Sequence, residues 1–147
     1  DVKDVKDVKD VKDVIKQYPN KRVLLVEDNS LNQEVARAML EQSAIEVESA
    51  YDGKEGVELA SNGKHYDLIL MDIQMPVMDG LQALKAINLD ENINHIPVVA
   101  FTALTSENEM NIFKKVGFQS HLPKPFDAEQ LFDVLDQFLI NGRDEKD

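Results

Sequence analysis

The stretch Tyr-Asp-Leu-Ile-Leu-Met-Asp-Ile-Gln-Met-Pro-Val-Met-Asp-Gly at residues 66–80 decides the fold class of this chain. Residues 66–71 contain a run of apolar side chains without alternation, which is typical of a strand buried on both faces. Asp72 follows the run, and Met75-Pro76 and Asp79-Gly80 are dipeptides that favour turns. Apolar residues at helical spacing come next. A buried strand that leads through a turn into a helix predicts a parallel sheet, because parallel strands need crossover helices.

The same alternation of short strands and amphipathic helices extends to both sides of this stretch. Each strand candidate is a short apolar run, and each helix candidate has apolar side chains every three or four residues. The chain is therefore predicted to have an α/β fold, with a single doubly wound five-stranded parallel sheet and five helices. The predicted strands are residues 23–26, 45–49, 66–71, 98–101 and 118–122.

Residues at the predicted helix boundaries support this division. Asp52 and Glu55 have the three-residue spacing of a capping box, and so do Ser106 and Glu109. Gly117 is a typical residue just beyond a helix end. The helices themselves are indicated by apolar side chains at Leu31, Val35, Met39 and Leu40, at Leu81, Leu84 and Ile87, and at Leu131, Val134, Leu135 and Phe138.

The composition of the 147 residues excludes several classes of function. The formal net charge is −12, and residues 1–16 contribute nothing to it because they contain five Asp and five Lys. The strong negative charge of the remainder argues against non-specific binding to DNA or to an anionic membrane surface. The chain has no cysteine, so disulfides, thiolate catalysis and cysteine-ligated zinc are excluded. No apolar run approaches the roughly 20 residues that span a bilayer.

The beginning of the chain differs from the rest. Residues 1–13 are a tandem repeat of Asp-Val-Lys that ends in Asp13. A period of three does not match the helical turn of 3.6 residues, so its valines form a poor packing face. We interpret residues 1–20 as a low-complexity linker or helical extension. Residues 21–141 then form one domain, and residues 142–147 a polar tail.

Polar side chains follow four of the predicted strands. Glu27 and Asp28 come directly after the first strand, and Asp72 after the third. Thr102 follows the fourth strand, and Lys124 the fifth. In doubly wound sheets, ligands bind beside the carboxyl ends of the strands. We therefore expect these five side chains to lie close together at one edge of the sheet.

These side chains together favour phosphoryl transfer. Neighbouring carboxylates attract a cation, and oxygen ligands without His or Cys favour Mg²⁺. A carboxylate at a strand end can be a nucleophile that forms an acyl phosphate. The transfer requires positioning and neutralisation of charge, which Mg²⁺ and a lysine ammonium supply from opposite sides.

Four motifs in this order resemble those of the response-regulator receiver domains of two-component systems. They are Val-Glu-Asp-Asn at 26–29, Met-Asp-Ile-Gln-Met-Pro-Val-Met-Asp-Gly at 71–80, Ala-Phe-Thr-Ala at 100–103 and Lys-Pro at 124–125. The resemblance covers about residues 21–140. It implies a flavodoxin-like fold with the strand order 2-1-3-4-5.

The resemblance also implies a role for each acid. Asp72 is the expected phosphoacceptor. Asp28, Asp72 and the main-chain carbonyl of Gln74 are expected to ligate Mg²⁺ directly. Glu27 is expected to act on the same ion through metal-bound water.

Three further residues receive an expectation from the family. Lys124 is expected to pair with the phosphoryl group, with a cis peptide bond between Lys124 and Pro125. Thr102 is the expected switch hydroxyl. His121 falls where family members usually carry Tyr or Phe, and this departure puts the coupling of Thr102 to a buried ring in doubt.

The implied function is that of a phosphorelay receiver, which accepts a phosphoryl group from phosphohistidine and switches conformation to signal to a partner. The amino-acid sequences of the motifs most resemble those of receivers in hybrid sensor histidine kinases. The expected partner is a histidine kinase or a histidine-phosphotransfer domain, and a homodimer is compatible with the family. The segment is expected to be cytoplasmic, alone or as the cytoplasmic part of a membrane-bound sensor kinase, without direct contact to nucleic acid or membrane. It would catalyse its own phosphorylation and dephosphorylation.

Two other functions compete with this interpretation. An interaction module could keep the fold without being phosphorylated, although the complete set of acids with Lys124 argues against it. An aspartyl phosphatase resembling the haloacid dehalogenases would need a second acid two residues after the nucleophile, where this chain has Gln74. Dinucleotide binding is disfavoured because no Gly-x-Gly-x-x-Gly follows the first strand.

Overall fold

A computed structural model describes residues 15–75, 77–103 and 106–141 of the chain. The Asp-Val-Lys repeat at 1–13 and the tail at 142–147, for which the sequence predicts a linker and a polar tail, lie outside these residues. Among the helices of the described segments, none is long and apolar enough to cross a membrane.

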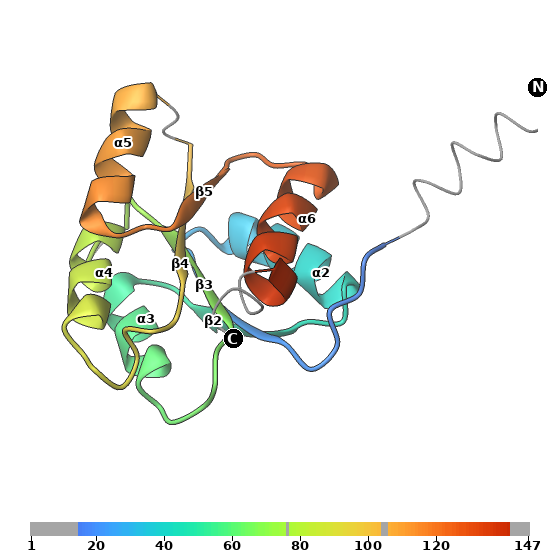
Figure 1. The fold of residues 1–147 in the computed structure, drawn as a ribbon, viewed down its shortest axis with the longest axis horizontal. Coiled ribbons are helices and arrows are strands. Elements are labelled where there is room, and N and C mark those ends of the chain that lie inside the picture. The colour runs from blue at the N-terminus through green and yellow to red at the C-terminus, as the bar shows by residue number, and fades with distance from the viewer. Residues whose placement is uncertain (1–14, 76, 104–105, 142–147) are drawn as a thin grey trace, which may run out of the picture.

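Five parallel strands form one sheet at the centre of the molecule (Figure 1). Their order is β2-β1-β3-β4-β5, and each neighbouring pair is parallel. This confirms the predicted doubly wound sheet and its 2-1-3-4-5 order. The strands are β1 Arg22–Val26, β2 Glu46–Ala50, β3 Leu68–Asp72, β4 Val98–Thr102 and β5 Ser120–Pro123.

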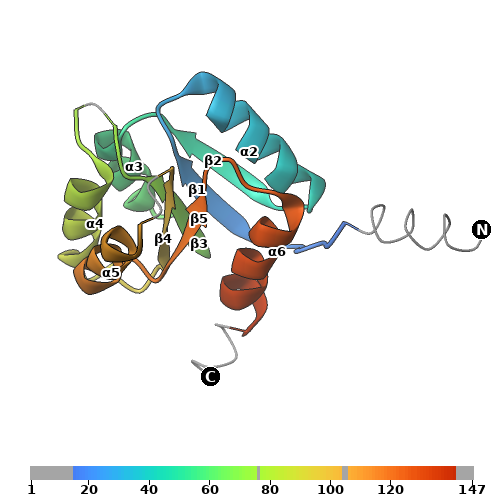
Figure 2. The same cartoon turned by 90° about the horizontal axis from the view of Figure 1, so that it is seen from above.

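Helices cover both faces of the sheet (Figures 1 and 2). The helices α2 and α6 lie on one face, and α3, α4 and α5 lie on the other. The helices are α2 Ser30–Gln42, α3 Gly53–Ala60, α4 Gly80–Asn88, α5 Glu107–Val116 and α6 Ala128–Asp136, followed by a short π-helix Gln137–Asn141.

The strand side chains alternate between two apolar layers. In β3, Leu68 and Leu70 pack with α2 and α6, whereas Ile69 and Met71 pack with α3, α4 and α5. The four apolar residues of β3 are buried, as the uninterrupted apolar run predicted, and Asp72 at the end of the strand is buried as well. A central strand covered on both faces therefore carries Asp72 to the edge of the sheet as its last residue.

The helix boundaries follow the predicted caps with one difference. Ser106 and Glu109 form the complete capping box of α5, and Gly117 ends the helix with a φ of 119°. Asp52 accepts a hydrogen bond from the main-chain N–H of Glu55, as predicted. The return bond differs, because Glu55 Oε1 accepts from the N–H of Tyr51 at 2.6 Å.

The helix α2 is present as predicted, but its apolar stripe does not face the core as a whole. Leu31 and Val35 have exposed fractions of 67 % and 51 %. The buried side chains of α2 are Gln33, Ala36 and Leu40. The helix is therefore rotated so that an amide side chain lies inside the protein.

The segment before β1 packs against the sheet and α6. Tyr18 is buried, and its hydroxyl donates a hydrogen bond to Asp136 Oδ1 at 2.8 Å. Lys16 Nζ forms an ion pair with the other oxygen of Asp136 at 2.6 Å. The main-chain N–H of Tyr18 donates to the carbonyl of Ser43 at 2.8 Å. Lys16 and Tyr18, which precede the proposed start of the domain at residue 21, are thus joined to α6.

Candidate functional site

Three acids meet at the carboxyl edge of the sheet. Glu27 and Asp28 follow β1, and Asp72 ends the neighbouring strand β3. One carboxylate oxygen of each residue lies within 4.8 Å of the others. Glu27 and Asp72 are buried, whereas Asp28 is exposed. The arrangement can take up a cation from the solvent side, since its exposed member lies at the surface.

Hydrogen bonds fix both the main chain and the side chain of Glu27. The main-chain N–H of Glu27 donates to the carbonyl of Ala50 at 3.0 Å, which extends the pairing of β1 with β2. Glu27 Oε2 accepts a hydrogen bond from the N–H of Asn29 at 2.9 Å. Asn29 also caps α2 by accepting from the N–H of Asn32. The turn from β1 into α2 therefore fixes the direction of the Glu27 carboxylate.

Lys124, directly after β5, contributes a positively charged side chain to the site. Its Nζ forms ion pairs with Glu27 Oε1 and, at 3.2 Å, with Asp72 Oδ2. The ammonium also lies 4.8 Å from the centre of the Phe101 ring, where a cation–π attraction acts on it. Only 17 % of the lysine side chain is exposed. The peptide bond between Lys124 and Pro125 is cis, as expected.

The loop after Asp72 passes close to the helix that follows it. Asp72 Oδ1 accepts a hydrogen bond from the N–H of Gln74 at 3.3 Å, and the side chain of Gln74 is exposed. The N–H of Gly80 donates to the carbonyl of Ile73 at 2.8 Å. Val77 has a φ of 67°, which is costly for a β-branched residue, and backbone strain of this kind concentrates at functional sites.

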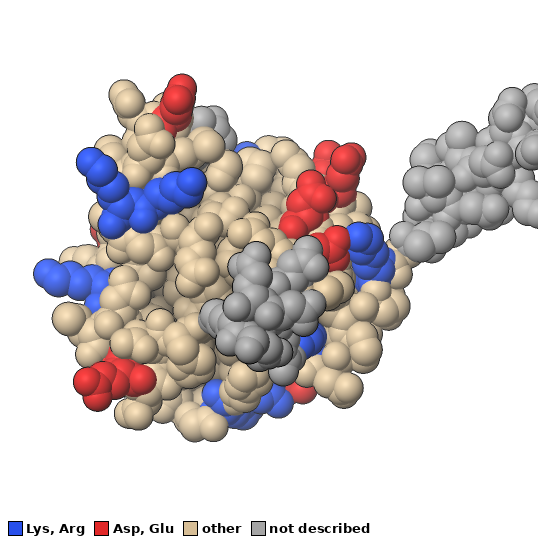
Figure 3. All heavy atoms as spheres, in the orientation of Figure 1, with Lys and Arg blue, Asp and Glu red and all other residues tan. Residues whose placement is uncertain are grey.

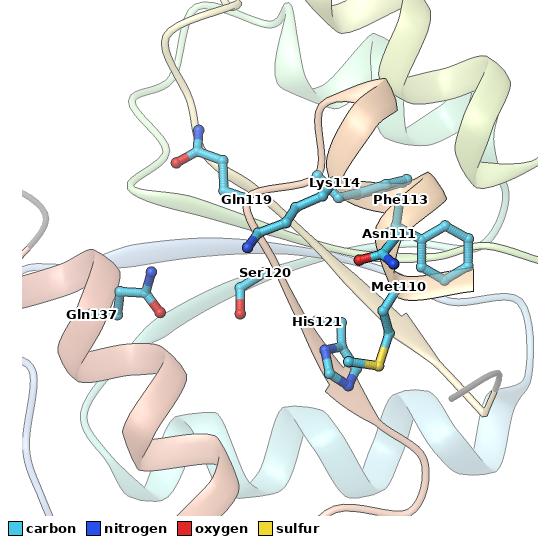
Figure 4. A pocket seen from close by; sticks show the side chains of 9 residues that line it. Met110, Asn111, Phe113, Lys114, Gln119, Ser120, His121 and Gln137 are labelled. Carbon is cyan, nitrogen blue, oxygen red and sulfur yellow. The ribbon is translucent and has the colours of Figure 1, made fainter. Parts of the chain in front are cut away.

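Thr102 and His121 lie on the neighbouring strands β4 and β5. Thr102 ends β4, is 2 % exposed, and accepts a main-chain hydrogen bond from Lys124 N–H at 3.1 Å. His121 pairs with Ala100 in the β4–β5 register and is partly buried. It borders a groove of about 320 Å³ between α5 and α6, with Met110 on the α5 side and Gln137 on the α6 side (Figure 4). His121 is therefore placed at the surface groove rather than in the acidic cluster.

The surroundings of Asp72 disfavour its ionised form. Burial and then the nearby charge of Glu27 raise the pKa of the Asp72 carboxyl to about 7, although Lys124 opposes this rise. A cation bound between the acids acts in the opposite direction, because it stabilises carboxylates. Binding of a cation and ionisation of Asp72 are therefore expected to support one another.

We expect the raised pKa to appear in the stability of the cation-free protein. A carboxyl whose pKa is higher in the folded state contributes stability that is fully present below the unfolded value and is lost as the pH rises through the folded value. For Asp72 this window runs from about 3.8 to about 7. Asp72→Asn is therefore expected to be more stable than wild type by about 1–3 kcal/mol at pH 8, and by less at pH 5.

Urea unfolding at both pH values in the presence of a chelator measures this difference. Glu58→Gln, which removes an exposed acid on α3, is measured in parallel as the control for the loss of one carboxylate. An equal effect of Asp72→Asn at pH 5 and pH 8 would contradict the assigned pKa. Excess Mg²⁺ should reduce the advantage of the variant, because the ion stabilises only the wild-type carboxylate.

Comparison with known proteins agrees with this geometry. The family model of the response regulator receiver domain matches residues 23–136. The polar-differentiation response regulator DivK of Brucella ovis is 35 % identical over 119 residues, which cover 81 % of this chain and 96 % of DivK. Two solved structures that are similar to the chain carry further information about such sites.

The first is the receiver domain of sensor histidine kinase PA1611 from Pseudomonas aeruginosa, solved with a magnesium ion in the active site cleft. It is 35 % identical, has a TM-score of 0.75, and the match covers 81 % of this chain and 97 % of that one. The second is the receiver domain of Ssk1 from Saccharomyces cerevisiae in complex with the histidine phosphotransfer protein Ypd1. That match has 30 % identity, a TM-score of 0.76, and coverage of 84 % and 91 %. The chain belongs to the response regulator receiver domain family of two-component signalling.

Proposed function

We propose that the domain is a phosphorelay receiver that accepts a phosphoryl group on Asp72. The observation that carries the proposal is that Asp72 contacts the ammonium of Lys124 at the strand edge where Glu27 and Asp28 also meet. Phosphoryl transfer requires neutralisation of charge, which a cation held by the acids and the ammonium of Lys124 would supply together.

The acids fit Mg²⁺ as the bound cation. Carboxylate oxygens from Glu27, Asp28 and Asp72 lie close enough to act on one ion, and no nitrogen or sulfur ligand takes part within the described segments. The magnesium ion in the PA1611 receiver supports this assignment. We propose that Asp28, Asp72 and the carbonyl of Gln74 ligate it directly, with Glu27 acting through water. When bound, the ion supplies charge neutralisation for the transferred group.

The remaining steps of the phosphoryl transfer are proposed for side chains of the domain itself. An Asp72 oxygen forms the new bond to phosphorus while the bond from phosphorus to the imidazole nitrogen of the donor breaks. The ammonium of Lys124 pairs with the charge of the incoming phosphoryl oxygens. We propose that Thr102, which ends the neighbouring strand β4, donates a hydrogen bond to one of these oxygens once the group is attached. Phosphorylation thereby changes the contacts of β4 and β5.

The partner is proposed to be a histidine kinase or a histidine-phosphotransfer domain. The complex of the Ssk1 receiver with Ypd1 supports this class of partner. For this chain we further propose an origin in a hybrid sensor kinase and a cytoplasmic location. The limits proposed from the sequence are 1–20 for the linker, 21–141 for the receiver and 142–147 for the tail.

We propose that a partner recognises the phosphorylation state of Asp72 at the groove beside His121. It lies over β5, the strand that leads into Lys124, and is bordered by α5 and α6. The last turn of α5 carries Lys114 and Lys115, and basic side chains are visible over α5 on this face (Figure 3). A shift of β4 and β5 on phosphorylation would therefore change a groove with a basic border.

The test is phosphorylation by a small donor. The protein is incubated with acetyl phosphate and Mg²⁺, and its intact mass is compared with that of Asp72→Asn. We expect a gain of one phosphoryl group in the wild type, which disappears without Mg²⁺ and in the variant. Beryllofluoride binding provides a second readout if the aspartyl phosphate hydrolyses quickly. If the wild type is not modified and does not bind beryllofluoride, the domain is an interaction module that works without phosphorylation.

A further inference from the structure

A buried amide on α2 lies behind the acidic site and is not explained by packing. Gln33 is 2 % exposed, although it is the fourth residue of a helix whose outer face is in solvent. Its two buried companions on the helix, Ala36 and Leu40, are apolar. A polar side chain in such a place is retained only if its hydrogen bonds compensate for the lost contact with water.

The amide nitrogen of Gln33 faces the carboxyl ends of two strands. Nε2 donates to the carbonyl of Ala50 at 2.9 Å and to that of Leu25 at 3.1 Å. It also lies 3.3 Å from the carbonyl of Glu27. Two amide hydrogens thus serve three main-chain oxygens. The reverse orientation of the amide would place Oε1 against the same oxygens and is excluded by repulsion.

The amide oxygen of Gln33 makes no comparable hydrogen bond among the described residues. Among the residues that the structure describes, Gln33 Oε1 is buried without a hydrogen-bond partner. An unsatisfied buried oxygen lowers the stability of a protein, whereas an apolar side chain of similar size would avoid this cost. The benefit of the glutamine must therefore come from the three carbonyls that Nε2 contacts.

These carbonyls belong to the backbone that carries the acids. Glu27 is held at its N–H by Ala50, at Oε2 by Asn29 and at its carbonyl by Gln33. The carbonyl of Glu27 is part of the peptide unit that leads directly into Asp28. Releasing it would free the peptide unit on which the exposed acid Asp28 depends for its orientation.

We propose that Gln33 is a positioning residue, which keeps Glu27 and Asp28 in the arrangement that binds the divalent cation. The proposal rests on the proposed function, because it concerns the same cation site. Gln33 itself does not touch the ion. It acts by fixing the ends of β1 and β2 against α2, and its loss would weaken binding without removing any ligand.

The test measures the binding of Mg²⁺ alone to Gln33→Met and to wild type by titration calorimetry. We expect the dissociation constant to rise by about 10- to 100-fold, the usual effect of removing a group that orients metal ligands. Gln33→Asn keeps the amide but shortens it, so it should weaken binding in the same direction. Having two variants keeps the test decisive if the methionine variant does not fold.

Ser43→Ala is the matched control. Ser43 is also buried, its Oγ has no hydrogen-bond partner among the described residues, and it lies at the opposite end of α2. Its replacement should leave the Mg²⁺ affinity unchanged. If the Gln33 variants bind as tightly as wild type and Ser43→Ala, the residue has only a structural role and the proposal is overturned.

A kinetic readout separates positioning from general damage. In phosphorylation by acetyl phosphate, the Mg²⁺ concentration for half-maximal rate should rise with the dissociation constant, while the rate at saturating Mg²⁺ stays close to that of wild type. A fall of the saturated rate alone would contradict the proposal. Absence of Mg²⁺ binding by the wild type would instead refute the proposed function, and with it this inference.

Discussion

Replacing Lys124 with methionine is expected to have the largest effect on stability of any single change at the site. The substitution leaves Glu27 and Asp72 buried beside one another without their counter-charge. Breaking a buried ion pair by removing one partner costs about 3–5 kcal/mol, because the remaining charge keeps its desolvation penalty. Urea unfolding at pH 8 in the presence of a chelator measures the loss.

The same variant is expected to lose phosphorylation. Removing a preorganised charge from the transferred group costs about 10²- to 10³-fold in rate, by analogy with other sites that stabilise developing charge. Mg²⁺ should restore part of the stability, since it supplies positive charge to the same acids, and the rate can then be measured on folded protein. Lys115→Met, an exposed lysine on α5, is the control. Unchanged stability of Lys124→Met without Mg²⁺ would refute the role of its ion pairs.

Gly80→Ala is expected to be strongly damaging although it alters no charge. A Cβ at this position would lie 2.3 Å from the carbonyl oxygen of Asp72 and 2.8 Å from the Cα of Ile73. Both neighbours are backbone atoms, so the loop or the start of α4 must shift. We expect a loss of about 2–4 kcal/mol in the free energy of unfolding, at the upper end of what overpacking costs.

The shift should also reach the chemistry, because the clashing oxygen belongs to the phosphoacceptor residue. Small misplacements of reacting groups lower rates steeply, and about a 10- to 100-fold slower phosphorylation is expected from acetyl phosphate at saturating Mg²⁺. Gly63→Ala is the control, since its Cβ would meet nothing within 4 Å although its φ is 90°. It should lose about 1 kcal/mol and phosphorylate normally. An equal effect of both alanines on the rate would show that general destabilisation, rather than contact with Asp72, is responsible.

Much of the fold could be predicted from the sequence because its central strands are uniformly apolar. The run at Leu68–Met71 has no alternation, and such a run requires cover on both faces and therefore parallel neighbours. The convergence of Glu27, Asp28 and Asp72 follows from the same topology, because the ends of neighbouring parallel strands meet at one edge. Their roles in phosphorylation stay predictions until the mass measurement is made.

The parts that escaped prediction are those where polarity and burial disagree. Leu31 and Val35 were expected on the helix stripe that usually faces a core, but both are exposed, whereas the polar Gln33 is buried. Periodicity assumes that polar side chains face water, and it has no means to recognise an amide that binds main-chain carbonyls. Tyr18 was missed for a related reason, because an isolated aromatic beside Pro19 has no period at all.

The anchoring of Tyr18 bears on how receivers are cut and exchanged between proteins. Similarity to the family begins at residue 23, so a border chosen by alignment would discard this side chain. Yet Tyr18 belongs to the apolar cluster formed with Leu40, Leu135 and Leu139, and removing it would leave a hole beneath the last helix. We therefore expect a segment that folds stably to begin before the residues matched by the family model. Chimeras that join this receiver to another sensor should carry the segment from Ile15 onwards.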